Sequence, residues 1–167
     1  MYYDSLLEVG YELNEQIFEG SRTVVWRATR VEDNTSVVLK FARQADADKR
    51  INKQLRSEFE ILSHKLREVD HVIKSIDLVE VDQSWLALVE EDLGLRNLGE
   101  YIPITNIKTV LEISIILAST LSQIHQRKIF HKDIKPQNIL VSSDLSIVKL
   151  TDFGSSSIFE TVPSATG

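Results

Sequence analysis

The sequence contains no cysteine and no excess of positive charge, and each absence removes a class of protein. Without cysteine, disulfide bonds and thiolate metal sites are excluded, which fits a reducing compartment. Acidic residues outnumber basic residues by 25 to 19, and the formal net charge is −6. Because nucleic-acid-binding proteins usually carry a basic face, we expect no nucleic-acid partner, although a small local site could still hold a nucleotide.

Processing signals and long apolar runs are also missing. The first residues show no basic stretch followed by an apolar run, so they do not read as a signal peptide. The most apolar window, Ile113–Leu121, contains hydroxyl side chains and is too short to span a bilayer. With 43% apolar and 26% charged residues in a chain of 167, we expect one soluble, cytoplasmic protein without a membrane segment.

The hydrophobic pattern changes along the chain from strands to helices. Short β-prone segments separated by turns predict five strands, at residues 10–18, 24–26, 37–39, 74–81 and 85–90. Apolar residues at helical spacing predict long amphipathic helices over 46–69 and 106–126, with a short helical stretch at 98–102. This order predicts an α+β fold, in which an antiparallel sheet carries one packed helix and is joined to a helical part.

The strongest chemical signal is the run His131-Lys132-Asp133-Ile134-Lys135-Pro136-Gln137-Asn138, followed by Asp152-Phe153-Gly154. Phosphoryl transfer needs a carboxylate to orient the attacking hydroxyl, cations to neutralise phosphate oxygens, and oxygen ligands for Mg²⁺. Asp133 can orient the hydroxyl, and Lys135 can reach the transferring phosphate. Asn138 and Asp152 can each offer an oxygen to Mg²⁺. Either motif alone could be a chance loop sequence, but both in this order are far less frequent by accident.

This block resembles the catalytic and metal-binding loops of eukaryotic-type protein kinases, and the lysine two residues after Asp133 is typical of the serine/threonine class. The resemblance implies a protein-kinase-like fold: a five-stranded antiparallel sheet with one packed helix, followed by a truncated, mainly helical lobe. It implies an N-lobe over 1–90, a hinge at 91–94, part of the C-lobe over 95–154, and the flexible start of an activation segment at 155–167. ATP and Mg²⁺ would be its cofactors, and a protein serine or threonine its target.

Upstream segments carry the resemblance further. Val37-Val38-Leu39-Lys40 resembles the third-strand motif whose lysine contacts the α- and β-phosphates, and such a lysine needs a carboxylate beside it. Glu58, on the first long helix, is the expected partner, in preference to Glu60. The resemblance also implies contacts to the nucleotide, besides Lys40, from Ile17, Gly20, Val25, Val38, Glu91, Leu93 and Leu140.

The sequence departs from the family pattern in several places. In the glycine-rich loop only the middle glycine, Gly20, is present, and Phe18 and Thr23 stand where the other two would be. The residue before the hinge, usually apolar, is either Val89 or Glu90; a buried Glu90 would need a cation, for which Lys40 is a candidate. Lys132 replaces an arginine that pairs with a phosphorylated activation loop, so we do not expect that form of control.

The finer resemblance is to the kinase domain at the N-terminus of large bacterial proteins that also carry an ATPase-like region and a sensor histidine kinase. Further domains of a longer signalling protein would then be partners. The chain ends before any Ala-Pro-Glu motif, so we expect it to stop within the activation segment. Two alternatives remain open: an inactive, nucleotide-binding interaction module, and a small-molecule phosphotransferase of kinase-like fold.

Overall fold

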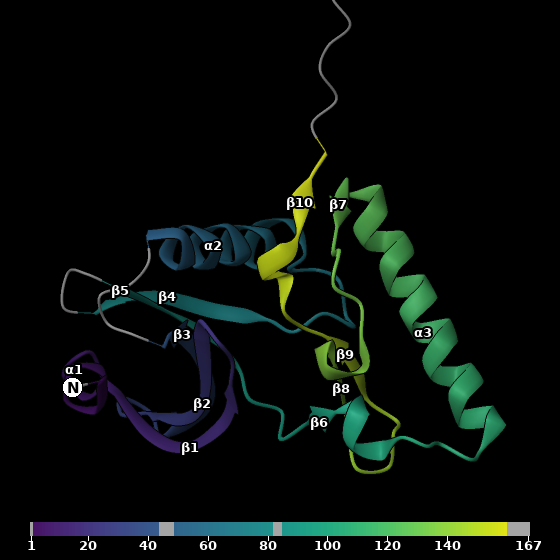
Figure 1. The fold of residues 1–167 in the computed structure, drawn as a ribbon, viewed down its shortest axis with the longest axis horizontal. Helices are drawn as coiled ribbons and strands as arrows, with labels where there is room; N and C mark the ends of the chain where they lie inside the picture. Colours follow the sequence, from purple (N-terminus) through teal and green to yellow (C-terminus); the bar gives the residue numbers. More distant parts are fainter. Residues whose placement is uncertain (1, 44–48, 82–84, 160–167) are drawn as a thin grey trace, which may run out of the picture. The chain divides into compact units, whose positions relative to one another are not determined.

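The structure is a computed structural model, and it describes residues 2–43, 49–81 and 85–159 (Figure 1). The chain divides into two compact units. The first contains the residues up to Arg67 together with Ile73–Leu95, and the second contains Glu68–Val72 and the residues from Arg96 onward.

A five-stranded antiparallel sheet forms the first unit, with the strand order β1-β2-β3-β5-β4 (Figure 1). The strands are β1 (Tyr11–Glu19), β2 (Thr23–Arg30), β3 (Thr35–Ala42), β4 (Ser75–Val81) and β5 (Trp85–Glu91). The predicted sheet of five antiparallel strands is therefore confirmed. Several strands extend beyond the predicted β-prone cores, because backbone pairing with a neighbouring strand continues through polar residues.

Side chains alternate between the two faces of this sheet, and a different helix covers each face. In β5, Trp85, Ala87 and Val89 join one apolar cluster, whereas Leu86 and Leu88 join another. β5 is buried from Trp85 to Glu90 for this reason. A strand that is covered on both faces reads as a continuous apolar run, which is what the sequence shows here.

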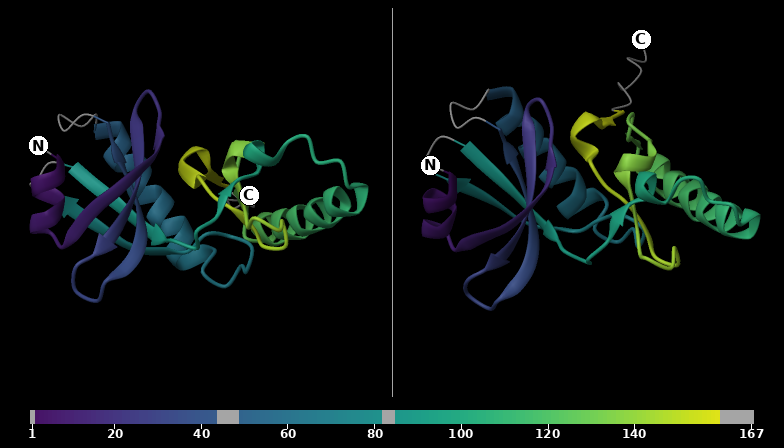
Figure 2. Two further views of the ribbon diagram at one scale, coloured as in Figure 1. Left: turned by 90° about the horizontal axis from the view of Figure 1, so that it is seen from below. Right: turned by 60° about the horizontal axis from the view of Figure 1, so that its bottom comes forward.

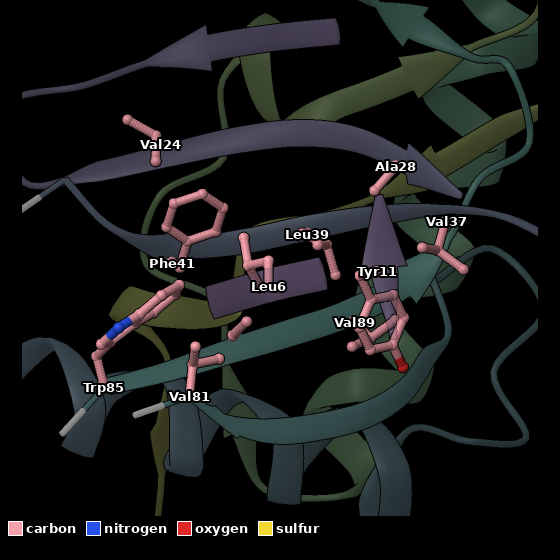
Figure 3. Close-up of a cluster of buried hydrophobic side chains, with 11 residues drawn as sticks. Leu6, Tyr11, Val24, Ala28, Val37, Leu39, Phe41, Val81, Trp85 and Val89 are labelled. Carbon is pink, nitrogen blue, oxygen red and sulfur yellow. The ribbon is translucent and has the colours of Figure 1, made fainter. Parts of the chain in front are cut away.

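Helix α1 (Tyr2–Glu8) covers the first face, and the sequence analysis did not predict it. Its Leu6 is fully buried at the centre of the apolar cluster drawn in Figure 3. The buried members of this cluster are Leu6, Tyr11, Val24, Ala28, Val37, Leu39, Phe41, Val81, Trp85, Ala87 and Val89. A helix of seven residues is too short to show a clear period in the sequence, so only its packing reveals it.

Helix α2 (Lys49–Glu60) covers the opposite face and continues into a π-helical turn, Ile61–Lys65 (Figure 2). Its Ile51 and Leu55 are buried in the second cluster. The predicted helix over 46–69 is right for 49–65, ends earlier than predicted, and has its first three positions outside the described residues. The predicted wet face, with Lys49, Arg50, Lys53, Arg56, Glu60 and Lys65, is exposed.

The second unit contains small sheets, 3₁₀ turns and one long helix. β6 (Arg96–Asn97), β8 (Ile139–Val141) and β9 (Val148–Leu150) form one sheet, and β7 (Ile129–Phe130) pairs with β10 (Ser157–Ile158). The 3₁₀ turns are Leu98–Tyr101, Pro136–Asn138 and Phe153–Ser155. In the segment 155–167, Ser157–Ile158 form a strand, and 160–167 lie outside the described residues; the predicted flexibility of this segment stays a prediction.

Helix α3 (Ile107–Gln126) begins at the predicted position because Asn106 caps it. The Asn106 side chain accepts a hydrogen bond from the backbone N–H of Lys108 at 3.0 Å, which satisfies a donor that the helix itself cannot use. The predicted apolar stripe supplies the buried Ile113 and Ile124.

The length of α3 overturns one argument made from the sequence. The helix has 20 residues and contains an 18-residue window with a mean hydropathy of 1.4, whereas the window considered in the sequence was Ile113–Leu121. Length therefore does not exclude a membrane span. A single helix that is long and apolar enough to cross a bilayer is weak evidence for a membrane span, because core helices of soluble proteins can be equally long and apolar.

Segment Glu68–Val72 anchors the strand that leads to the predicted metal-binding loop. The backbone N–H of Leu150 donates to the carbonyl of His71 at 2.8 Å, and Nδ1 of His71 lies 2.9 Å from the carbonyl oxygen of Val148. The Lys149 ammonium donates to the carbonyl of Asp70 at 2.6 Å. These contacts fix the end of β9, two residues before Asp152.

Candidate functional site

The first unit brings together the two charged residues expected from the sequence. Nζ of Lys40, in β3, lies 3.0 Å from Oε1 and 2.9 Å from Oε2 of Glu58, in α2. The Glu58 side chain is fully buried and that of Lys40 is 9% exposed. Glu60 is exposed, so the structure selects Glu58 as the partner of Lys40. That Lys40 contacts phosphate stays a prediction.

Strand register identifies the residue that shares a face with Lys40. Val38 is opposite Glu90, and Leu39 is opposite Val89. Because directly opposed residues lie on the same face, Glu90 and Lys40 share one face, while Val89 packs in the α1 core. Of the two alternatives left open, Glu90 therefore lies on the face that carries the buried ion pair, and it is only 5% exposed.

The turn between β1 and β2 is a tight hairpin. The backbone N–H of Gly20 donates to the carbonyl of Thr23 at 2.8 Å. A Cβ built on Gly20 would lie 2.9 Å from the Phe18 ring, so the missing glycine side chain leaves room for this aromatic residue. Val25 is opposite Lys40 and on its face, and Ile17 is exposed. The predicted contacts of these residues with a nucleotide stay predictions.

The segment after β5 is held by one carboxylate, Asp92. Its Oδ2 accepts hydrogen bonds from Nε of Arg27 at 2.8 Å and from Oγ of Ser36 at 2.7 Å. Its Oδ1 accepts the backbone N–H of Gly94 at 2.9 Å. Burial by itself raises the pKa of Asp92, but the hydrogen bonds from Ser36 and Gly94 and the charge of Arg27 outweigh it and lower that pKa. Asp92 is therefore ionised at neutral pH.

The backbone groups of Glu91 and Leu93 differ in whether they already form hydrogen bonds within the protein. Glu91 is the last residue of β5, and its N–H donates to the carbonyl of Lys74 at 2.9 Å, so that N–H is already used; the contact of Glu91 with a nucleotide stays a prediction. Among the described residues, neither the N–H nor the carbonyl of Leu93 has a hydrogen-bond partner. The Leu93 side chain is exposed. Leu93 therefore presents a free donor and a free acceptor, which is a pattern suited to the edge of a base.

The second unit brings together the acidic, basic and amide groups of the predicted catalytic run. Oδ2 of Asp133 accepts hydrogen bonds from the Lys135 ammonium at 2.7 Å and from Nδ2 of Asn138 at 2.9 Å. Nδ2 of Asn138 also donates to the backbone carbonyl of Asp133 at 2.9 Å. The hydrogen bond from Lys135 lowers the pKa of Asp133, and the same bond raises the pKa of Lys135. Within the described part of the chain, Oδ1 of Asp133 has no donor and can accept a hydroxyl proton.

His131 ties the catalytic run to the segment that carries Asp152. The backbone N–H of Asp133 donates to its Nδ1 at 3.3 Å, so Nε2 carries the proton and donates to the carbonyl of Thr151 at 2.9 Å. The His131 ring also packs against Phe153, with 4.6 Å between ring centroids. His131 is buried, and it therefore acts as a neutral link between the two loops.

Backbone conformation marks the same two loops. Lys132 and Asp152 have φ values of 68° and 63°, in the left-handed region that residues with a side chain seldom adopt. Such conformations persist only where the surrounding structure imposes them, and they concentrate at functional sites. Asp152 also lies close enough for its charge to act on both Asp133 and Lys135: it adds to the rise in the pKa of Lys135 and partly opposes the lowering of the pKa of Asp133.

The oxygens of Asn138 and Asp152 suit Mg²⁺. Because Nδ2 of Asn138 is used by Asp133, its Oδ1 points elsewhere and accepts no hydrogen bond from any described residue. No group of three or more histidine, aspartate or glutamate side chains able to hold a metal occurs among the residues that the structure describes. Mg²⁺ is commonly held by one or two protein oxygens together with phosphates and water, so a carboxylate and an amide oxygen fit it. Leu140 lies in β8, partly buried, and its contact with adenine stays a prediction.

Two functional features escaped the sequence analysis. The contacts of Asp92 join residues 65 and 56 positions apart in the chain, which no local pattern reveals. The link through His131 was also missed, although the histidine stood inside the motif already singled out. The position of His131 at the start of that motif was the one sequence feature that could have indicated this link.

Comparison with known proteins agrees with this geometry. The protein kinase domain matches residues 11–166. Cyclin-dependent kinase 2 of Caenorhabditis elegans is 34% identical over 146 residues, which cover 83% of this chain and 38% of that protein. Serine/threonine-protein kinase ATG1b of Arabidopsis thaliana is 32% identical over 151 residues, which cover 86% of this chain and 20% of that protein. Serine/threonine-protein kinase ULK3 of Xenopus laevis is 32% identical over 147 residues, which cover 85% of this chain and 31% of that protein.

The chain spans less than two fifths of the length of these three relatives. The match concerns the domain, and the further resemblance to a bacterial branch stays a prediction.

Proposed function

This chain belongs to the protein kinase family, and we propose that it binds Mg-ATP and transfers the γ-phosphoryl group to a serine or threonine hydroxyl of a protein. The observation that carries the proposal is the cluster around Asp133. In it, Lys135 and Asn138 both donate hydrogen bonds to Oδ2 of Asp133 and so fix the orientation of the carboxylate. Oδ1 of Asp133 accepts no hydrogen bond from any described residue. That arrangement is suited to orienting a hydroxyl nucleophile.

In the first unit, Lys40 supplies the positive charge for the nucleotide phosphates. Glu58 holds its ammonium through two hydrogen bonds, so the cation is ordered before any ligand arrives. Val25 and Val38 share the face of Lys40 and offer apolar surface to adenine. Leu93 offers the backbone donor and acceptor for the base.

In the second unit, Asn138 and Asp152 would hold Mg²⁺ through oxygen atoms. When bound, Mg²⁺ neutralises charge that develops on the phosphate oxygens. Asp133 accepts a hydrogen bond from the attacking hydroxyl and later its proton, and Lys135 stabilises negative charge on the transferring group. Since the pKa of Asp133 is lowered by Lys135, its carboxylate is in the accepting form throughout the neutral range.

One observation favours a second function, a nucleotide-binding interaction module without transfer. The Phe18 ring fills the space beside Gly20, in the loop where the family has glycines that let backbone N–H groups approach phosphate. A looser hold on the phosphates would preserve binding and reduce transfer. A small-molecule phosphotransferase is less favoured, because Lys135 follows Asp133 at the protein-kinase spacing.

The test is transfer of labelled γ-phosphate from Mg-ATP to a mixture of serine- and threonine-containing peptides, with amino sugars and choline as competing acceptors. We expect labelled peptide with the wild-type chain and none with Asp133→Asn, while both proteins bind Mg-ATP. Binding without transfer by the wild-type chain would favour the interaction module. Labelled choline or sugar in place of peptide would overturn the choice of substrate. A cytoplasmic location and membership of a longer signalling protein remain part of this proposal.

A further inference from the structure

The turn after β5 is fixed at three points by one side chain. Asp92 accepts the backbone N–H of Gly94, two residues on, which is a turn that aspartate side chains form with their own backbone. Gly94 has φ of 64°, a conformation that costs glycine little. The other carboxylate oxygen of Asp92 is bound to Arg27 of β2 and to Ser36 at the start of β3.

Arg27 is itself held from the opposite side. Its Nη1 lies 2.7 Å from Oε2 of Glu15 in β1, while its Nε donates to Asp92. Arg27 is opposite Val38, so it lies on the face of the sheet that carries Lys40. The Asp92 side chain is only 7% exposed, and water therefore competes little for its hydrogen bonds. The network connects three strands to the turn that contains Leu93.

We propose that Asp92 is a positioning residue for the nucleotide base: by tying this turn to Arg27 and Ser36, it holds the free N–H and carbonyl of Leu93 in the orientation that a purine edge requires. This inference rests on the proposed binding of ATP. Donors and acceptors that are ordered before binding need no further ordering when the ligand arrives, so affinity is higher than for a mobile turn.

The chain offers a matched control in Asp33. Asp33 also pairs with an arginine of β2, Arg30, at 2.6 Å, and also accepts a backbone N–H two residues on, from Thr35 at 3.1 Å. Its turn joins β2 to β3 and contains no residue of the proposed base contact. Asp33→Asn therefore removes a comparable charge and comparable bonds without touching Leu93.

The experiment measures the affinity of the 167-residue chain for Mg-ATP and for adenosine, which has the purine but no phosphate. We expect Asp92→Asn to weaken both ligands by the same factor, about tenfold, because part of a charge-assisted hydrogen-bond network is lost. Ser36→Ala, which removes a single exposed donor and leaves the fold intact, should weaken both by about threefold. Asp33→Asn should change neither, and Asp152→Ala should weaken Mg-ATP alone.

Several results would overturn the inference. Wild-type affinity for both ligands in Asp92→Asn and Ser36→Ala would show that the network does not set the base contact. If Asp92→Asn lowered the affinity for Mg-ATP but left the affinity for adenosine unchanged, the network would act on the phosphates and not on the base. An equal loss in Asp33→Asn would show only general damage to the sheet. If the wild-type chain binds neither ligand, the proposed function fails as well, and this outcome is separate from a failure of Asp92 alone.

Discussion

The buried pair of Lys40 and Glu58 gives the prediction with the largest expected effect on stability. Glu58→Gln keeps the shape of the side chain and removes its charge, while the Lys40 ammonium stays in a site that is 9% exposed. Breaking a buried pair by removing one partner costs about 3–5 kcal/mol, because the remaining charge is left uncompensated. For a chain of this length each kcal/mol lowers the melting temperature by about 2–4 °C, so we expect a fall of about 6–20 °C.

Tryptophan fluorescence is the suitable assay, because both tryptophans of the chain, Trp26 and Trp85, belong to the first unit. Their signal follows the unit that contains the pair. The matched control is Glu19→Gln, which breaks the ion pair between Glu19 and Arg43, where both side chains are about half exposed. Surface pairs contribute about 0–1 kcal/mol, so the control should shift the melting temperature by less than about 4 °C.

A double variant separates stability from function. Replacing both members by apolar residues of similar size, as in Lys40→Met with Glu58→Leu, removes both buried charges together. Such replacements are often neutral or stabilising, so we expect the double variant to recover the melting temperature of the wild type but not the response to Mg-ATP. The reasoning would be refuted if Glu58→Gln melted within about 2 °C of the wild type, or if the double variant were less stable than either single variant.

Three further predictions concern the frame of the site. Leu6→Ala should lower the free energy of unfolding by about 2–5 kcal/mol, measured by urea denaturation, because Leu6 is fully buried; a change below about 1 kcal/mol would mean that α1 does not pack on the sheet. Asn106→Ala should cost about 1 kcal/mol in the same assay and reduce helical circular dichroism, since the cap of α3 is lost, whereas Asn106→Asp should not. The pKa of Asp92 is lower in the folded state than its unfolded value near 4, so its stabilising contribution is complete above that pH and is lost as pH falls toward the folded pKa. Asp92→Asn should therefore flatten the loss of stability below about pH 4, and an unchanged acid profile would contradict the hydrogen bonds assigned to Asp92.

The sequence predicted those features that depend on local pattern. The strands followed from β-prone runs between turns, and α2 followed from the spacing of Ile51 and Leu55. Glu58 could be preferred to Glu60 because helical geometry places only Glu58 on the buried face. The catalytic run was recognisable because its chemistry is contained in eight consecutive residues.

Contacts between distant segments that no motif marks could not be predicted. Arg27 and Asp92 come into contact only when β2 and β5 are placed in one sheet, and the local sequence of neither segment indicates the other as its partner. The face of Glu90 could not be assigned because a shift of one residue in register reverses every side chain of a strand. The helix predicted over 106–126 agrees with α3, but only the window Ile113–Leu121 was considered as a membrane span, because polar residues on either side of it shortened the apolar run.

The central claim, that this chain binds Mg-ATP and that Lys40 of the first unit and Asp152 of the second unit are each required, is tested most directly by thermal unfolding with ATP in the presence and absence of Mg²⁺. A ligand that binds only the native state raises its melting temperature by mass action. We predict a rise that requires Mg²⁺ and that is lost in Lys40→Met and in Asp152→Ala. A cooperative transition that does not respond to Mg-ATP in the wild-type chain would contradict the account.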